Sequence, residues 1–232
     1  MFKKKRKKVE QKTARQLIAV ASPRSIISEQ FRTIRTNLTF SLPDEDLNTL
    51  FFTSASPSEG KSTVSANTAV TFAQAGKKVL FIDADMRKPT VHYTFALPNA
   101  AGLSTVLTAQ ISVEEVIRKT DIDNLSVITS GPIPPNPSEL LGSKGMSFLI
   151  EQMKKQYDII VFDAPPTLSV TDAQILSNEM DGTVLVIDAG HTEKETITKA
   201  KELLEQADAK ILGVVLNNYT DEDSGYYEYY GE

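Results

Sequence analysis

Residues 49–70 read TLFFTSASPSEGKSTVSANTAV. The first six residues of this stretch form an apolar run typical of a short buried strand. A loop with Gly60, Lys61 and Ser62 follows, and the pattern is then helical until Gly76, a residue type that commonly follows a helix. A strand, a loop ending in Gly-Lys-Ser and a helix form the context that a phosphate-binding loop requires. The sequence therefore predicts a phosphate site at the start of this helix.

The loop has suitable chemistry for a nucleotide. Main-chain N–H groups at a helix start point towards bound phosphate, Lys61 supplies a positive charge to the β- and γ-phosphates, and the Ser62 hydroxyl would bind Mg²⁺. Ala55 stands where the general pattern has its first glycine, and a bare Gly-Lys-Ser triplet also begins ordinary helices. The strand before it and acids nearby favour the phosphate interpretation. The expected nucleotide contacts are Ser58, Glu59, Gly60, Lys61, Ser62 and Thr63.

Five further apolar runs alternate with helical stretches. The runs are KKVLFIDAD (77–85), NLSVITSG (124–131), YDIIVFDAPP (157–166), GTVLVIDAG (182–190) and AKILGVVLNN (209–218). The helical stretches are 25–40, 103–118, 144–156, 171–178 and 193–207. Continuous apolar strands are expected where helices cover both faces of a parallel sheet. The alternation predicts an α/β fold, a doubly wound and mainly parallel sheet of the P-loop NTPase type.

Three aspartates end two of these apolar runs: Asp83, Asp85 and Asp163. Aspartate often ends a strand for reasons of turn geometry, which explains any one of them. Three at the carboxyl ends of two strands, beside a phosphate site, would repel a nucleotide unless a hard cation lay between them. We therefore expect Mg²⁺ held by Ser62, Asp83 and Asp163.

The first helical stretch has an apolar stripe and a charged face beside it. The stripe is Ile27, Phe31, Ile34 and Leu38. The charged residues Glu29, Arg32 and Arg35 recur every three positions, so the simplest interpretation is a solvated face with an i, i+3 ion pair. Farther along, Ser138 is a candidate N-cap for a helix that follows the proline-rich loop GPIPPNP.

Composition limits the function classes. The chain has 232 residues, 41% of them hydrophobic, a net charge of −5 and no cysteine, so disulfides, thiolate metal sites and cysteine nucleophiles are excluded. No apolar run approaches the roughly 18 residues that span a bilayer, and a cytoplasmic protein is expected. Residues 3–8, KKKRKK, are either a solvated end or a segment attracted to anionic lipid. The acidic remainder disfavours nucleic-acid binding.

The C-terminal residues 224–232, SGYYEYYGE, hold four of the seven tyrosines: Tyr226, Tyr227, Tyr229 and Tyr230. Folded domains seldom leave so many aromatic rings in a tail. One interpretation is an aromatic patch that packs locally. The other is a mobile segment whose phenols reach an active site, which the nucleotide loop favours.

ASPSEGKST, FIDADMRKP and IIVFDAPP, followed by a tyrosine cluster, resemble the bacterial tyrosine kinases (BY-kinases). More closely, the chain is similar to the separate cytoplasmic kinase subunit that Gram-positive bacteria use in capsule and exopolysaccharide synthesis. It implies Walker A at 55–63, Walker A′ at 80–85 and Walker B at 159–163. Partitioning and division-site ATPases are similar, but they have a second lysine where this chain has Ser56.

The resemblance implies an ATP- and Mg²⁺-dependent autokinase that phosphorylates the four tail tyrosines in trans. The expected catalytic residues are Lys61, Asp83, Asp85 and Asp163. Asp85 is the best candidate to accept the phenol proton, since Asp83 and Asp163 are expected on the metal. Arg87 or Lys88 would neutralise developing charge, and Asn217 would contact adenine by analogy with related folds.

The resemblance also implies partners. Glu29, Arg32 and Arg35 match a helix that BY-kinases use as a subunit contact in closed, ring-like homo-oligomers. A separate transmembrane activator, tyrosine-containing protein substrates and a cognate phosphatase are expected, with the kinase at the inner face of the membrane through its partner. The expected segments are a basic flexible 1–24, a kinase domain 25–218 and a mobile tail 219–232. The alternatives are a spatial-organisation ATPase and a nucleotide-gated scaffold for polysaccharide export.

Overall fold

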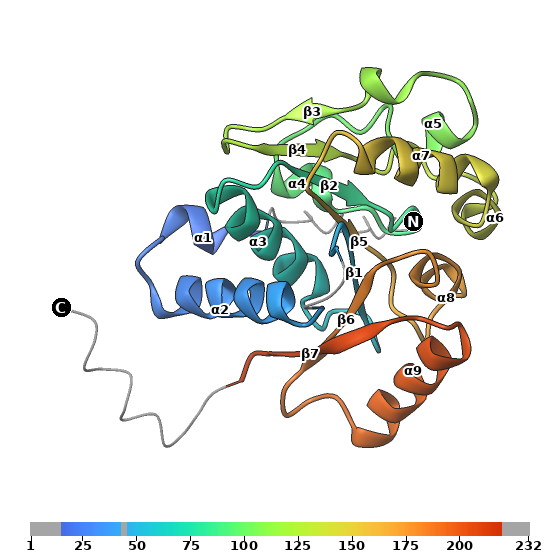
Figure 1. Cartoon of the computed structure of the whole chain (residues 1–232). Helices are drawn as coiled ribbons and strands as arrows, with labels where there is room; N and C mark the ends of the chain where they lie inside the picture. The colour runs from blue at the N-terminus through green and yellow to red at the C-terminus, as the bar shows by residue number, and fades with distance from the viewer. Residues whose placement is uncertain (1–14, 43–45, 220–232) are drawn as a thin grey trace, which may run out of the picture.

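The computed structural model describes residues 15–42 and 46–219. Its centre is a seven-stranded sheet in the order β3-β4-β2-β5-β1-β6-β7 (Figure 1). Every neighbouring pair is parallel except β3–β4 at one edge. The strands are β1 Thr49–Ser54, β2 Val79–Asp83, β3 Arg118–Lys119, β4 Leu125–Ile128, β5 Ile159–Asp163, β6 Gly182–Asp188 and β7 Ile211–Asn217. The predicted α/β class and mainly parallel sheet are confirmed.

Helices cover both faces of the sheet, as Figure 1 shows. Alternate side chains of one strand enter different cores: Phe51 packs with the helices of one face and Phe52 with those of the other. One layer comprises α1 Ile18–Ala21, α2 Ile26–Phe40, α3 Lys61–Gln74 and α4 Val91–Thr94. The other comprises α5 Leu103–Leu107, α6 Pro137–Leu141, α7 Lys144–Lys154, α8 Asp172–Ser177 and α9 Lys194–Gln206. Burial on both sides explains why the strands read as continuous apolar runs.

Helix α2 begins at the predicted place, because the Ser25 hydroxyl accepts a hydrogen bond from the Ser28 N–H at 3.2 Å. Phe31 and Leu38 are buried as predicted. The prediction for Ile27 is wrong, since this residue is 51% exposed. Ser28 is buried in its place, and its hydroxyl donates to the Ser22 carbonyl at 2.7 Å. In the first turn of α2, the buried position is therefore Ser28, one residue after the apolar position that the stripe predicted.

The predicted helix at 103–118 is wrong beyond its first turns. Helix α5 ends at Leu107, and Ala109 adopts a left-handed φ of 55° that a helix cannot continue. A new 3₁₀ turn, Val113–Glu115, then begins with a capping box in which Glu115 accepts from the Ser112 N–H at 3.1 Å. The antiparallel edge strand β3 follows. The Ser-x-x-Glu pattern at 112–115 was the signal for this second start.

The ordered fold begins earlier than the predicted boundary at residue 25. Ala19 in α1 is fully buried, and its N–H donates to the Asn67 side chain in α3 at 3.0 Å. Gln74, also in α3, donates to the Ala19 carbonyl at 3.0 Å. Residues 15–24 are therefore part of the domain, whereas the basic residues 3–8 lie outside the described part of the chain.

Candidate active site

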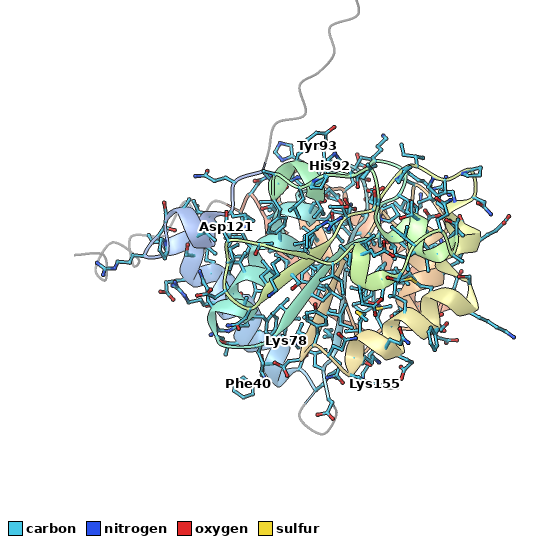
Figure 2. The ribbon with its side chains drawn as sticks, turned by 90° about the horizontal axis from the view of Figure 1, so that it is seen from above. Phe40, Lys78, His92, Tyr93, Asp121 and Lys155 are labelled. Atoms are coloured by element: carbon cyan, nitrogen blue, oxygen red, sulfur yellow. The ribbon has the colours of Figure 1, made fainter. Side chains whose placement is uncertain are left out.

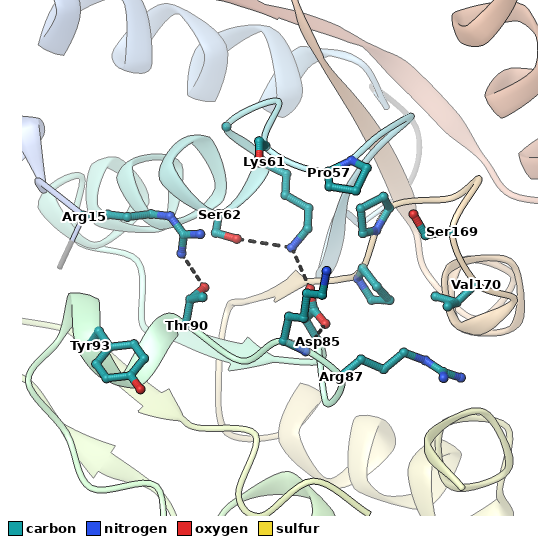
Figure 3. Close-up of a pocket in the computed structure, with 15 residues that line it drawn as sticks. Arg15, Pro57, Lys61, Ser62, Asp85, Arg87, Thr90, Tyr93, Ser169 and Val170 are labelled. Carbon is teal, nitrogen blue, oxygen red and sulfur yellow. Dashed lines mark hydrogen bonds and ion pairs between the residues drawn. The ribbon is translucent and has the colours of Figure 1, made fainter. Parts of the chain in front are cut away.

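Three loops meet at the carboxyl edge of the sheet, because β2, β5 and β1 are neighbours. They follow β1, β2 and β5, and they carry the three predicted motifs. A cavity of about 550 Å³ opens between them (Figure 3). It is lined by Pro57, Ser58, Gly60, Lys61 and Ser62 from the first loop and α3, by Asp85, Arg87, Lys88, Thr90 and Tyr93 from the second, by Pro165, Pro166, Ser169 and Val170 from the third, and by Arg15. The sheet therefore brings Lys61 and Asp85 together as predicted.

The first loop has the conformation of an anion-binding turn. Ser58 and Gly60 adopt left-handed φ values of 71° and 89°. Within residues 15–42 and 46–219, the N–H groups from Ser58 to Ser62 have no hydrogen-bond partner. Such N–H groups at the start of a 14-residue helix, together with its dipole, suit a phosphate. The predicted nucleotide contacts of this loop therefore rest on its main chain.

Gly60 is required here for a second reason, its closeness to Asn217. A Cβ on Gly60 would lie 2.0 Å from the Asn217 Nδ2 atom. That amide donates to the Glu59 carbonyl at 3.1 Å, so the end of β7 is tied to the phosphate loop. Asn217 was predicted at the nucleotide site; it contacts the phosphate loop but is not among the residues that line the cavity.

The Glu59 side chain braces the loop. It is buried, and its two oxygens accept hydrogen bonds from the Ser56 N–H at 2.8 Å and from the Thr192 hydroxyl at 2.5 Å. Both oxygens of Glu59 are thus engaged within the chain. Its expected contribution to a nucleotide is limited to its main-chain N–H.

Lys61 stands between two carboxylates. Its Nζ atom lies 3.3 Å from Asp85 Oδ2 and 3.2 Å from the Ser62 hydroxyl (Figure 3). The same atom lies 3.3 Å from Asp163 Oδ1. Burial acts to lower the pKa of Lys61, but the charges of Asp163, Asp85 and Asp83 outweigh it and raise the pKa above its usual value. The lysine is therefore cationic at neutral pH and can transfer its charge to an incoming phosphate.

Asp83 occupies a different environment from Asp85. It is fully buried, and its carboxylate accepts hydrogen bonds from the N–H groups of Asp85 at 3.2 Å, Thr90 at 3.2 Å and Val91 at 3.1 Å. Burial, followed by repulsion from Asp163 and Asp85, raises the pKa of Asp83 to about 8. Asp83 therefore fixes the main chain of the second loop through these hydrogen bonds, whereas Asp85 is the acid that lines the cavity.

The residues fit a nucleotide-bound Mg²⁺ better than a free ion. Asp163 Oδ2 is buried and has no hydrogen-bond partner among the described residues, so it can accept a metal-bound water or a metal. No group of three or more His, Cys, Asp or Glu in that part of the chain is arranged to hold a metal. An ion would need phosphate oxygens and the Ser62 hydroxyl to complete its ligands.

A bidentate ion pair holds Arg87, which sequence reasoning considered as a free charge at the site. Its Nε and Nη2 atoms lie 2.9 Å from the two oxygens of Asp172, which is fully buried at the start of α8. Burial acts to raise the pKa of Asp172, but hydrogen bonds from Arg87 and Ser138 lower it below its usual value. The Ser138 hydroxyl donates to Asp172 at 2.7 Å, whereas Asn136 occupies the N-cap of α6. The prediction of Ser138 as N-cap is wrong.

The charged face of α2 is partly used within the chain. The predicted ion pair forms between Arg32 and Glu29 at 2.5 Å, and Arg32 also donates to the Pro23 carbonyl at 2.6 Å. Arg35 turns inwards and donates to the Thr71 carbonyl in α3 at 3.0 Å. Glu29 is therefore the exposed member of this face, whereas Arg32 and Arg35 are both half-buried.

The tyrosines 226, 227, 229 and 230 lie outside the described residues. Across the described ranges, the helices are all too short or too polar to cross a bilayer.

Comparison with known proteins gives three findings. A family model described as "AAA domain" matches residues 58–211. Tyrosine-protein kinase YwqD of Bacillus subtilis is 52% identical over 94% of this chain and 92% of its own, whereas tyrosine-protein kinase wzc of Salmonella typhimurium is 38% identical over 92% of this chain but 30% of its own. The crystal structure of the chimerical protein CapA2B2 superimposes with a TM-score of 0.85 at 44% identity, over 90% of this chain and 93% of that one.

Proposed function

Because the chain belongs to the family of bacterial tyrosine-protein kinases, we propose that its cavity transfers the γ-phosphoryl group of ATP to tyrosines in the tail of a second copy. The predicted family, fold class and enzyme class are confirmed: the chain is a protein-tyrosine kinase with a nucleotide-binding fold. The observation that carries the proposal is the position of Lys61, held between Asp85 and Asp163 beside five N–H groups that have no partner among the described residues.

In the proposed reaction the phosphate loop binds ATP, Asp163 contributes to metal binding and Asp85 accepts the proton of the tyrosine. The N–H groups from Ser58 to Ser62 bind the β- and γ-phosphates, and Lys61 exchanges its carboxylate contacts for phosphate oxygens. Ser62 and Asp163 would hold Mg²⁺ bound with ATP, directly or through water, and the ion would neutralise charge on the phosphates. The tyrosine oxygen forms a bond to the γ-phosphorus as the bond to the β-phosphate oxygen breaks, and ADP leaves.

Asp85 is the group proposed to take the phenol proton. It is the acid that lines the cavity, and its Oδ2 faces Lys61 at 3.3 Å while its Oδ1 accepts from the Lys88 N–H at 2.9 Å. Two contacts fix the carboxylate at the cavity wall, where an incoming phenol would arrive. The enzyme is thus left with a protonated Asp85, which must lose its proton before the next turnover.

The proposed acceptors are Tyr226, Tyr227, Tyr229 and Tyr230 of a neighbouring subunit in a ring, with Glu29 and Arg32 at the subunit contact and Arg35 supporting α2 from inside. Each phosphate adds about −1.5 to −2 charges to an acidic tail, so phosphorylation would loosen the ring and a cognate phosphatase would restore it. Asn217, whose side chain donates to the Glu59 carbonyl of the phosphate loop, is proposed to contact the adenine base.

A transmembrane activator is the proposed partner. The chain corresponds to only 30% of the length of the wzc relative, and in this system we propose that the remaining functions belong to a separate membrane protein. The kinase would then lie at the inner face of the membrane and regulate capsule or exopolysaccharide synthesis.

The alternatives are a spatial-organisation ATPase and a nucleotide-gated scaffold. The first is disfavoured by Ser56, which stands where those ATPases have a second lysine and whose N–H is occupied by Glu59. Incubation with labelled ATP separates the kinase from the ATPase. A kinase incorporates label into tyrosine, Lys61→Met abolishes this labelling, and changing the four tail tyrosines to Phe removes most of it. An ATPase would hydrolyse ATP without labelling the protein, and a scaffold would keep its cellular role with Asp85→Asn.

A further inference from the structure

We propose that the mouth of the cavity is a subsite for an acidic peptide that contains the acceptor tyrosine. In this subsite Arg15 and Lys88 bind carboxylates that flank the tyrosine, and Tyr93 packs against its ring. The inference rests on the proposed kinase activity of the same cavity and specifies which substrates it accepts.

Among the residues that the structure describes, the cavity lining has four cations and one acid, Asp85. Lys61 is balanced by Asp85 and Asp163, and Arg87 is balanced by the buried Asp172. Arg15 and Lys88 have no carboxylate within 4.0 Å in the described part of the chain. Two uncompensated positive charges therefore face a cavity large enough for a side chain and its neighbours.

Arg15 is held in place by the N-terminal segment that precedes α2. Its Nη1 atom donates to the Thr90 hydroxyl on the second loop (Figure 3). The next residue, Gln16, is fixed to α3 because its carbonyl accepts a hydrogen bond from Asn67 Nδ2 at 3.4 Å. The Oδ1 atom of Asn67 accepts in turn from the Ala19 N–H. A guanidinium carries five N–H donors, so those not given to Thr90 can bind a carboxylate.

Lys88 and Tyr93 complete the mouth. The Lys88 main-chain N–H donates to Asp85 Oδ1 at 2.9 Å, which fixes the backbone of Lys88 next to the proposed proton acceptor, and Lys88 lines the cavity. Tyr93, on α4, is 42% exposed, and the centroid of its ring lies 3.9 Å from the centroid of the His92 ring. Both aromatic residues project from the rim of the molecule (Figure 2). An exposed ring at a cavity mouth can pack against an incoming phenol in an offset or edge-on arrangement.

The fitting partner is an acidic, tyrosine-containing segment, which the chain itself possesses. Residues 219–232 contain five acids and no basic residue: Asp221, Glu222, Asp223, Glu228 and Glu232. Glu228 separates the tyrosine pairs, so any acceptor has a carboxylate within two or fewer positions. Charge complementarity of this kind selects a partner and speeds its encounter.

The test is peptide binding by fluorescence anisotropy, with the full chain whose four tail tyrosines are changed to Phe. One labelled peptide is residues 219–232, and the other has every Asp and Glu replaced by Asn and Gln. We expect the acidic peptide to bind at least about fivefold more tightly, and Arg15→Gln with Lys88→Gln to bring this ratio close to one. Lys199→Gln, an exposed cation on α9, is the matched control that leaves the ratio unchanged.

Tyr93 has its own variants in the same assay. Tyr93→Ala weakens both peptides to a similar degree, since the ring contact does not depend on charge, whereas Tyr93→Phe retains binding of both. Equal binding of the acidic and neutral peptides by the otherwise unchanged chain, or an unchanged ratio in the double variant, overturns the inference. Phosphotyrosine formation without any charge preference would refute the subsite alone, whereas selective binding without phosphotyrosine would refute the proposed kinase reaction and with it the acceptor role.

Discussion

Asp83 and Asp163 lie at paired positions on the adjacent parallel strands β2 and β5, both fully buried and facing one site. Their partners differ. Asp163 faces Lys61, whereas Asp83 accepts three main-chain hydrogen bonds from the loop that follows it. Two carboxylates so close cannot both be ionised without a compensating cation, and Lys61 supplies that charge to Asp163 more directly. Asp163 therefore contributes charge at the phosphate site, whereas Asp83 holds the main chain of the second loop in its conformation.

This difference between the two acids predicts a pH dependence of stability. The pKa of Asp83 is raised to about 8 in the folded protein, so its proton is held more tightly there than in the unfolded chain. Its contribution to the free energy of unfolding is full below the unfolded pKa of about 4 and disappears as the pH rises through about 8. Thermal melting between pH 6 and 9 should show a decrease in stability that is smaller in Asp83→Asn. An exposed control, Glu202→Gln, should follow the unsubstituted protein; an equal slope in Asp83→Asn would contradict the assignment.

Asp163 should matter most to phosphoryl transfer. Asp163→Asn removes the carboxylate opposite Lys61 and one proposed contact to Mg²⁺, so we expect phosphotyrosine formation to fall about 100-fold or more. The same change removes a repulsive neighbour of Asp83, so the pKa of Asp83 should decrease towards its usual value. Phosphotyrosine blotting measures the first effect and the pH dependence of melting the second. Retained activity would exclude Asp163 from the reaction.

Gly60 offers a matched comparison with Gly190. Both have a left-handed φ, 89° and 78°, but a Cβ on Gly60 would meet Asn217 Nδ2 at 2.0 Å, whereas Gly190 has nothing within 4 Å. Gly190→Ala should cost only the strain of the left-handed conformation, about 1 kcal/mol. Gly60→Ala adds a clash and should also abolish nucleotide binding, measured by calorimetry with ATP. Adding Asn217→Ala should recover part of the stability; identical effects of the two alanine substitutions would contradict the geometry.

The Arg87–Asp172 pair should stabilise the second loop. Asp172→Ala leaves the Ser138 hydroxyl without its acceptor and frees Arg87, and we expect a loss of about 1–3 kcal/mol in urea denaturation, moderated because Arg87 is 39% exposed. Arg87→Gln and the double variant complete a cycle. Strictly additive effects would show that the two side chains do not interact in solution. Because the pKa of Asp172 is lowered in the folded protein, its contribution should also be lost as the pH falls through that pKa.

The sheet, its two helical layers and the meeting of Lys61 with Asp85 and Asp163 were predictable, because apolar periodicity and the strand–loop–helix context are local signals. Contacts over long separations were not. Arg15 meets Thr90 across 75 residues and Arg87 meets Asp172 across 85, and nothing near either residue in the sequence indicates its partner. The broken helix after Leu107 was missed because the apolar pattern continued through the turn at Ala109, although the Ser112–Glu115 capping box was visible.

Transfer of phosphate between copies of this chain can be measured in a mixture of two variants. Lys61→Met with intact tail tyrosines is combined with a chain whose Tyr226, Tyr227, Tyr229 and Tyr230 are changed to Phe, in ATP and Mg²⁺. Intact-mass spectrometry then follows phosphate on each chain separately. We predict phosphate on the Lys61→Met chain only, in the mixture and not in either protein alone. Absence of phosphate from that chain, while the unsubstituted protein does become phosphorylated, would contradict transfer in trans.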